Sequence, residues 1–341
     1  MITVLLVVAI ATILAVAMLR SQHLALQRAA GLFSQDQALL YTQGAEDFVR
    51  ELLRQDADED KRSGKPVDHP GEVWARPFPP FPVDGGVINA RVIDLQGRFN
   101  VNRVWHDNAP DPAAIAIFQR LLKNLDLPDT LAPALTDWID ADSDPTGSDG
   151  AEDDMYSRLD TPYRVANQPL SDVSELRLIK GFTPEVMLKL RPYVCTLPAT
   201  ALLNINMADP VMLSALGASI SARHASELSS QRPAKGYASV DEFLGQPVFN
   251  GMDSDRKAEL RNQLDVSSHY FQLIADADIA GRHSMVLAMI ARSDSGTLQV
   301  VARDFSQKVA APAAGAKSSD ESSKSSDPTM DNAVKAARDL L

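Results

Sequence analysis

The sequence predicts an α+β protein with a long N-terminal helix, a small antiparallel sheet, and a large all-α domain inserted between the strands of that sheet. Three observations predict this fold class. Residues 1–55 contain no proline and keep apolar residues near helical spacing. Strand-like alternation follows at residues 87–102 and returns after residue 267. The chain between those two stretches has the period of amphipathic helices.

Composition sets the outer limits. At 341 residues the chain has room for about two domains. Its hydrophobic fraction of 45% and charged fraction of 23% exclude disorder of the whole chain. A net charge of −12 disfavours a general nucleic-acid binder, which needs Lys and Arg to displace counterions from phosphates. The single cysteine, Cys195, excludes an intramolecular disulfide and a multi-thiolate zinc site.

Residues 1–20 are expected to form the membrane-spanning part of the first helix. Residues 1–19 carry no charge, and at 1.5 Å per residue they extend about 28 Å, close to the thickness of the bilayer's hydrocarbon core. A secretory signal peptide is disfavoured, because nothing basic precedes the apolar run and no small-x-small site ends it. The alternative is a plain single-pass anchor with a helical stalk.

Residues 21–55 are predicted to continue this helix as an amphipathic segment. Its apolar residues recur near helical spacing and are candidates for an interface with partner helices. They are Leu24, Leu26, Leu32, Phe33, Leu39, Leu40 and Phe48.

Residues 56–103 are assigned to a linker and the first strands. The polar stretch DADEDKRSGKPVDHPG is expected to end the helix, and the prolines of WARPFPPFPVDGG predict an extended or turning connector. The alternation in VINARVIDLQGRFNVN predicts two short strands around a turn at residues 95–98.

Residues 104–267 are predicted to form the inserted helical domain, and residues 268–305 the C-terminal strands. Gly281 and residues 294–296 mark two hairpin turns between these strands. Strands before and after the helical block would then pair in one sheet. The tail, residues 306–341, is rich in Ser, Ala, Lys and Asp, so we expect it to be disordered with at most a weak terminal helix.

An acidic run occupies residues 137–160, with nine acids and one base, Arg158. Asp140, Asp142 and Asp144 follow the spacing of positions 1, 3 and 5 of a calcium loop, and acids near residue 152 can supply the closing carboxylates. The run is not an EF-hand, because position 6 is Pro145 and position 12 is Ala151. A solvated acidic loop and a pair of catalytic carboxylates are the alternatives.

Two stretches resemble helix-hairpin-helix units. One is VSELRLIKGFTPEVMLKLRPYV, and the other turns around Gly217. Such hairpins can hold DNA phosphates through backbone N–H groups. However, Arg223 is the nearest base to the second turn, so packing of a core is the simpler interpretation.

Five stretches carry a family resemblance: MITVLLVVAIATILA, VDHPGEVWARPFPPFPVDGG, GRFNVN, the run from DWIDADSDPTGSDGAEDDMYSRLD to LRLIKGF, and LNINMAD. Together they resemble the minor pseudopilin K family of the type II secretion system, the GspK or XcpX family, and they span most of residues 1–305. The apolar first helix is similar to that of type IV pilins and their relatives, from which a short basic leader is removed.

The resemblance implies a pilin-like fold with a helical domain inserted in its sheet, and one or two calcium ions in the acidic region. Candidate ligands are carried over only where the acidic motif matches: Asp140, Asp142, Asp144, Asp149, Glu152, Asp153 and Asp154. The resemblance also implies a single-pass protein of the inner membrane, with most of its chain in the periplasm and no enzymatic activity.

The same resemblance implies a place at the tip of a short pseudopilus. Minor pseudopilins I and J would complete a ternary tip complex. The other expected partners are pseudopilins H and G, the inner-membrane assembly platform and the prepilin peptidase. The resemblance also implies the processing and methylation that are typical of the family.

Most pilin-like subunits carry a glutamate within the first few residues, but residues 1–19 have none. A buried unpaired carboxylate is costly in lipid, so its absence suits a subunit with nothing stacked above it.

Two rival functions stay open at this point. A membrane-anchored DNA-binding protein, of the kind that competence receptors represent, predicts duplex binding that is lost when Arg223 and Lys235 become Ala. A membrane-anchored calcium-dependent hydrolase predicts loss of turnover in Glu152→Gln.

Overall fold

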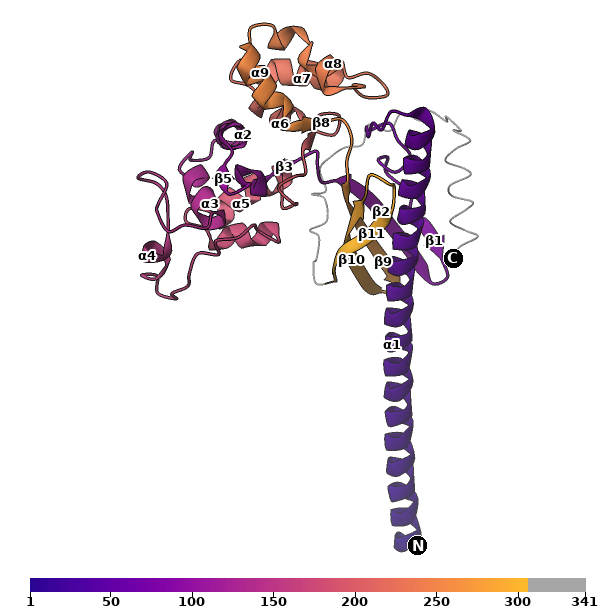
Figure 1. The fold of residues 1–341 in the computed structure, drawn as a ribbon. Helices are drawn as coiled ribbons and strands as arrows, with labels where there is room; N and C mark the ends of the chain where they lie inside the picture. The colour runs from indigo at the N-terminus through magenta and orange to yellow at the C-terminus, as the bar shows by residue number, and fades with distance from the viewer. Residues whose placement is uncertain (306–341) are drawn as a thin grey trace.

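The computed structural model describes residues 1–305, and its first element is one long helix, α1 (Ile2–Ser63) (Figure 1). The polar stretch from Asp56 to Gly71 ends the helix, as predicted, but the boundary that we placed after residue 55 was about two turns too early. A helix accommodates charged side chains well, so it continues through this polar stretch until the first glycine, Gly64. Gly64 adopts a left-handed conformation (φ 66°), and its N–H donates to the Asp60 carbonyl. Lys61 and Arg62 lie in the last turn, where their positive charges interact favourably with the negative end of the helix dipole.

A five-stranded antiparallel sheet lies beside the C-terminal half of α1 (Figure 1). Its strand order is β1-β2-β9-β10-β11. The strands are β1 (Phe81–Val83), β2 (Gly86–Asp94), β9 (Tyr270–Ile279), β10 (Arg282–Arg292) and β11 (Leu298–Asp304). β2 pairs with β9 from Gly86↔Ile279 to Asp94↔Phe271, which confirms that strands on either side of the helical block form one sheet. The hairpin turns at Gly281 and at residues 294–296 are also confirmed.

The core of this first unit is the seam between α1 and the sheet. Burial in β9 alternates residue by residue, as expected for a strand with one covered face. Its buried side chains, Phe271 and Leu273 among them, pack with residues of α1 at helical spacing, such as Ala38, Val49 and Leu53. Every residue from 1 to 30 is exposed, so this seam holds only the second half of the helix.

The second strand predicted after residues 95–98 does not form a hairpin with β2, and this is a correction. The turn itself exists, since the Arg98 N–H donates to the Leu95 carbonyl (3.2 Å). Beyond it, β3 (Phe99–Asn100) leaves the sheet and pairs in parallel with β6 (Val194–Cys195). Gly97 passes so close to the Met207 carbonyl that a Cβ would lie 2.7 Å from its oxygen. The turn therefore leads into the inserted domain.

The inserted domain occupies the chain between β2 and β9 and has its own apolar core, as the sequence predicted. Its helices are short, and most begin at a side chain that accepts a backbone N–H bond, such as Asp111, Thr183, Asp209 and Ser221. They are α2 (Pro112–Asn124), α3 (Leu131–Ile139), α4 (Asp153–Tyr156), α5 (Pro184–Leu190), α6 (Pro210–Ala215), α7 (Ala222–Ser230), α8 (Val240–Leu244) and α9 (Ser254–Arg261).

Smaller elements complete this domain. The stretch that we predicted as a helix at VSELRLIKG is a 3₁₀ helix (Val173–Leu178). Two further pairs of two-residue strands are β4 (Trp105–His106) with β5 (Ala109–Pro110), and β7 (Leu203–Asn204) with β8 (Leu264–Asp265). The predictions for residues 306–341 lie outside the described residues.

Candidate functional site

Three carboxylates converge in the loop between α3 and α4. Asp140 ends α3, Asp142 follows two residues later, and Glu152 precedes the first residue of α4. One oxygen from each side chain lies within 4.8 Å of the others. The loop therefore folds back on itself and brings the end of one helix to the beginning of the next.

Asp137 holds this acidic loop in shape from the last turns of α3. Its carboxylate is fully buried and accepts hydrogen bonds from the backbone N–H groups of Thr146 (3.0 and 3.1 Å) and Ala151 (2.7 Å). Gly150 lies against it, since a Cβ there would be 2.3 Å from Asp137 Oδ2 and 2.5 Å from the Thr146 nitrogen. Only glycine fits this approach without displacing the carboxylate.

The converging carboxylates lack neutralising partners. Asp140 and Glu152 are 3% and 5% exposed, and Asp140 Oδ1 and both Glu152 carboxylate oxygens have no hydrogen-bond partner. Burial, followed by Asp142 and Asp137, raises the pKa of Asp140 to about 6. Burial, followed by the neighbouring acids, raises the pKa of Glu152 to about 7. Across residues 1–305, no Lys or Arg side chain forms an ion pair with any of the three.

This donor set fits a hard divalent cation. Calcium is bound through oxygens at 2.3–2.6 Å, so two oxygens on one ion can lie up to about 5 Å apart. Carboxylate oxygens within 4.8 Å of one another meet that condition, and the group contains no thiolate or imidazole for a softer metal. Desolvated carboxylate oxygens without hydrogen-bond donors are atoms that a cation would satisfy.

Asn167 brings a further unpartnered oxygen next to the acidic loop, which spacing did not reveal. Its Nδ2 donates to the Asp142 carbonyl (3.1 Å), and its Oδ1 is buried without a partner. Asn167 lies well outside the calcium-loop pattern in sequence, and no local signal distinguishes it. Its left-handed backbone (φ 47°) is a conformation that Asn tolerates better than most residues.

The structure places the other four predicted ligands outside the converging group: Asp144, Asp149, Asp153 and Asp154. Asp153 Oδ1 accepts a hydrogen bond from the Val165 N–H (3.0 Å), which fixes the segment after α4. Asp154 forms an exposed ion pair with Arg158 (3.6 Å). Asp144 and Asp149 are exposed side chains of the same loop.

The N-terminal half of α1 carries an uncovered apolar surface. By length and composition this helix can cross a membrane, which is compatible with a single-pass anchor. Beyond the first 20 residues, six of the seven predicted interface residues stay exposed, from 36% to 71%: Leu24, Leu26, Leu32, Phe33, Leu39 and Leu40. We refer to these six residues as the α1 apolar face.

Phe48 does not belong to that face, and this is a correction. It is 8% exposed and packs edge-on against Phe78 and Phe81, with ring centroids 5.9 and 5.7 Å away. Helical spacing alone could not show this, because the covering rings come from the proline-rich connector. The boundary between exposed and covered helix therefore falls before Phe48.

The helical hairpins contribute to the core of the inserted domain. Gly181 (φ 87°) approaches Leu131 so closely that a Cβ would lie 2.8 Å from that side chain. Beside the second hairpin, Arg223 Nε donates to Glu227 (2.9 Å), so its charge is paired within its own helix. No observation at these hairpins favours a DNA interface.

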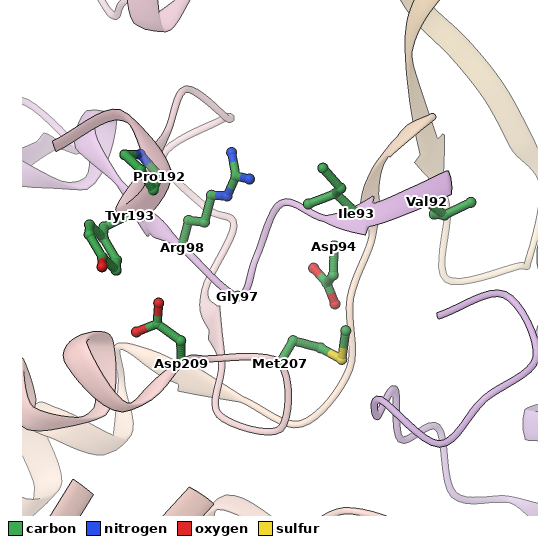
Figure 2. Close-up of a pocket in the computed structure, with 9 residues that line it drawn as sticks. All are labelled: Val92, Ile93, Asp94, Gly97, Arg98, Pro192, Tyr193, Met207 and Asp209. Carbon is green, nitrogen blue, oxygen red and sulfur yellow. The ribbon is translucent and has the colours of Figure 1, made fainter. Parts of the chain in front are cut away.

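A shallow pocket of about 250 Å³ lies where β2 leaves the sheet for the inserted domain (Figure 2). Figure 2 shows Arg98, Met207 and Asp209 among its lining residues. Asp209 is engaged as the N-cap of α6, where it accepts from the Met212 N–H (2.9 Å). We assign the pocket to the junction between the two units.

Comparisons with known proteins agree with one another. Two family models, both described as type II secretion system (T2SS), protein K, match residues 97–199 and 203–267. A type II secretion system protein K of Pseudomonas aeruginosa is 34% identical over 90% of this chain and 92% of its own length. The protein of that name from Pectobacterium carotovorum is 36% identical over 89% and 95%.

A solved structure shares the fold as well. It is a chain from the GspK-GspI-GspJ complex of the enterotoxigenic Escherichia coli type 2 secretion system, with 30% identity and a TM-score of 0.74. The match covers 82% of this chain and all of that one. The family matches span the helical insertion, and the structural match extends over most of the chain. The chain therefore belongs to the protein K family of the type II secretion system.

Proposed function

We propose that this protein is the minor pseudopilin at the tip of the type II secretion pseudopilus. In this role it begins and caps assembly together with pseudopilins I and J, and it serves the export of folded proteins across the outer membrane. It is anchored in the inner membrane by one span before assembly, with its bulk in the periplasm. Its further contacts are with pseudopilins H and G, the assembly platform and the prepilin peptidase. The role is structural, without catalysis.

The α1 apolar face is the observation that carries this proposal. Large apolar side chains such as Leu32 (64% exposed) and Phe33 (71%) would face water in the isolated chain, at a cost of about 25 cal/mol per Å² of exposed apolar surface. The face continues directly from the segment that can cross a membrane. Helices of pseudopilins I and J are suitable occupants, and the structural neighbour comes from a complex of GspK, GspI and GspJ.

The placement of the inserted domain supports the capping role. Figure 1 shows this domain beside the sheet and beyond it, far from the N-terminal end of α1. A domain at that end would obstruct another subunit stacked above. Residues 1–19 contain no acid that would pair with a neighbour's N-terminus, which suits the same position.

Calcium in the acidic loop is part of the proposal. Asp140, Asp142 and Glu152 would bind it, with Asn167 as an additional oxygen donor. The ion would supply the positive charge that the described ion pairs do not provide. The residues of the loop would then join the end of α3 to the beginning of α4, which stabilises one side of the inserted domain.

A pull-down experiment tests the assignment of α1. Tagged full chain in detergent is expected to retain pseudopilins I and J, and Leu32→Asp/Leu40→Asp is expected to lose them, because a charge on this face cannot be desolvated against partner helices. Leu188→Asp is the matched control, since Leu188 is 81% exposed on α5 of the inserted domain. Equal retention by all three proteins would refute this interface.

A further inference from the structure

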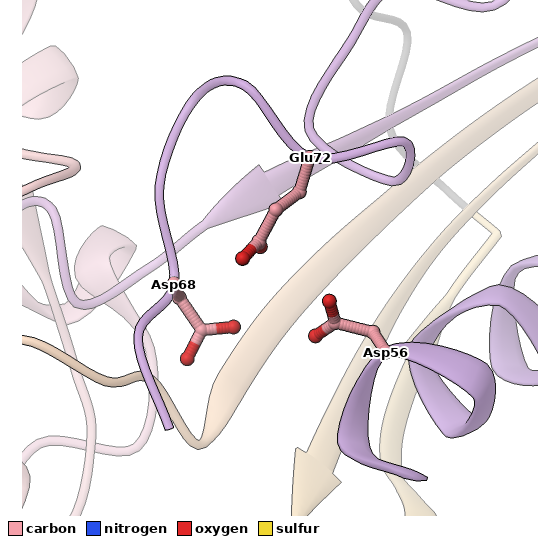
Figure 3. A group of neighbouring side chains, drawn as sticks. All are labelled: Asp56, Asp68 and Glu72. Atoms are coloured by element: carbon pink, nitrogen blue, oxygen red, sulfur yellow. The ribbon is translucent and has the colours of Figure 1, made fainter. Parts of the chain in front are cut away.

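A second group of carboxylates lies far from the acidic loop, where the last turns of α1 meet the connector that follows. Asp56 projects from α1, and Asp68 and Glu72 from the connector (Figure 3). One oxygen of each side chain lies within 4.8 Å of the others. Figure 3 shows the three carboxylates turned toward a common space. None of them was singled out from the sequence, because Asp68 and Glu72 follow Asp56 by twelve and sixteen positions, and no local pattern links them.

Arg292 at the end of β10 is the cation that contacts this group. It donates from Nη1 to Asp56 Oδ2 (2.8 Å) and from Nη2 to Asp68 Oδ2 (2.5 Å). It is itself buried, over the ring of Phe271. One guanidinium thus faces three carboxylates, of which Glu72 receives no contact from it.

The remaining neighbours do not balance the charge. His69 Nε2 is 3.6 Å from Glu72 Oε1, but burial, aided by the nearby cations Lys235 and Arg76, lowers the pKa of His69 and favours its neutral form. Asp60 is a further nearby acid on α1. Burial, with Asp56, Asp68 and Asp60 adding to it, raises the pKa of Glu72 to about 10. Among the residues that the structure describes, the acids of this group therefore outnumber the cation in contact with them.

Two oxygens in the group have no donor at all. Asp68 is completely buried, and its Oδ1 atom has no hydrogen-bond partner, although Oδ2 is bonded to Arg292 and to the Ser268 N–H (2.6 Å). Glu72 Oε2 is likewise buried without a partner. A buried carboxylate oxygen that nothing satisfies costs free energy comparable to a lost charged hydrogen bond. A bound cation would remove that cost.

We propose that Asp56, Asp68 and Glu72 form a second site for a hard divalent cation, with calcium preferred to magnesium. The donor set contains only oxygens, at separations that one calcium ion can span. Arg292 would hold Asp56 and Asp68 in place through the oxygens that it already contacts. This site is independent of the acidic loop and does not rest on the function proposed above.

The site lies at a structural junction, which gives it a purpose. Asp68 Oδ2 accepts from Ser268 N–H, and the Ser268 hydroxyl donates to Asp94, the last residue of β2 (2.6 Å). Asn204 of the inserted domain donates to the Asp68 carbonyl (3.1 Å) and to the Ser268 hydroxyl (2.8 Å). A cation here would tie together α1, the connector and both chain crossings into the inserted domain, and so fix how that domain sits on the sheet.

The test is the number of calcium ions that the full chain binds in detergent, measured by equilibrium dialysis. Asp140→Asn/Glu152→Gln disables the acidic loop, and Glu72→Gln disables the second site. Asp60→Asn is the matched control, since it removes one nearby charge from α1 without touching the three ligands. Magnesium is titrated in parallel.

The acidic-loop variant is expected to keep one ion, which Glu72→Gln then removes and Asp60→Asn does not. Glu72→Gln should also raise the unfolding temperature in chelator by a few degrees, because Gln needs no proton to be buried whereas Glu72 must take one up on folding at neutral pH. This gain separates lost binding from a failure to fold. Binding by the acidic-loop variant that persists in Glu72→Gln would overturn the proposal. Absence of any ion in the acidic-loop variant would overturn it too and would leave a proton on Glu72 as the balancing charge. Calcium binding by the acidic loop is tested separately, by whether the single variant Glu72→Gln retains one ion.

Discussion

Asp137 shows how a residue can shape a binding loop without being one of the converging ligands. It is fully buried, and it fixes the loop through the Thr146 and Ala151 N–H groups. Asp140, Asp142 and Glu152 are thereby held close together at a cost in repulsion. The energy that organises the loop and the charge that would bind a cation come from different side chains.

The contact between Gly150 and Asp137 can be tested directly. In Gly150→Ala the new Cβ would meet Asp137 Oδ2 at 2.3 Å, so we expect the loop to shift and calcium affinity to fall at least tenfold, which is about 1.4 kcal/mol. Gly251→Ala is the control, because no atom lies within 4 Å of a Cβ at Gly251. Calorimetric titration of both variants measures the effect, and equal affinities would contradict the role given to Asp137.

Glu152 should make stability depend on pH in a definite direction. Its pKa is raised to about 7 in the folded chain, so its protonated form favours folding at low pH, and that contribution is lost as pH rises through about 7. In chelator, the original chain is expected to lose about 1 kcal/mol relative to Glu152→Gln between about pH 5 and about pH 8, allowing for solvent screening.

Calcium should make the original chain more stable than Glu152→Gln, the reverse of the difference expected in chelator. At saturating calcium and about pH 8, the original chain gains RT ln(1 + [L]/Kd), about 2.7 kcal/mol at a concentration of 100 Kd, and Glu152→Gln gains much less. Thermal unfolding of both proteins at the two pH values, with and without calcium, measures these differences. A pH response that is the same in both proteins would exclude Glu152 as the titrating group.

At this scale the sequence was partly informative. Calcium-loop spacing pointed to Asp140 and Asp142, the family resemblance placed Glu152 with them among seven candidates, and these three side chains converge in the structure. The supporting role of Asp137 and the amide oxygen of Asn167 depend on how the loop folds back. Side chains that meet only after folding, such as Glu72 and Arg292, leave no local pattern.

At the scale of elements, α1 is one helix with two environments. From residue 38 onward one stripe packs on the sheet, with Val49 and Leu53 fully buried. Before that point the helix has few contacts within the chain, and its apolar side chains are exposed, which is compatible with a membrane span. Continuous helical hydrogen bonding lets one element belong to both environments.

This division predicts a contrast between two leucines of α1. Leu53→Ala removes a fully buried side chain and should lower the free energy of unfolding by about 2–5 kcal/mol. Leu40→Ala, at a site that is 65% exposed, should change it by less than about 0.5 kcal/mol and instead weaken binding of pseudopilins I and J. Urea unfolding followed by circular dichroism measures both. Similar losses in the two variants would place the boundary elsewhere on the helix.

The elements themselves were predicted better than their ends. Long-range periodicity identified α1 and the strand pattern of β2, β9 and β10. The end of α1 was placed too early, because DADEDKRS is polar yet compatible with a helix until Gly64. The hairpin expected after β2 failed because a turn does not determine which strand its second arm will join.

At the scale of the whole molecule, the change of period along the chain predicted the insertion. Strand patterns on both sides of a helical block can bury their apolar faces together only if they pair, and β2 does pair with β9. The orientation of the inserted domain could not be predicted from the sequence, because it depends on contacts between distant residues at the junction around Asp68, Asn204 and Ser268. The inserted helical domain lies to one side of the sheet and away from the N-terminal end of α1 (Figure 1). This arrangement is compatible with a subunit at the end of a filament.

The most direct test of the tip assignment is the number of copies of this chain in a complex with pseudopilins I and J. Full-length chain in detergent is mixed with both partners, and the mass of the complex is measured by light scattering after size-exclusion chromatography. A cap is used once, so we expect a complex with one copy of each protein. Complexes that contain several copies of this chain, or no complex at all, would contradict the assignment to the tip.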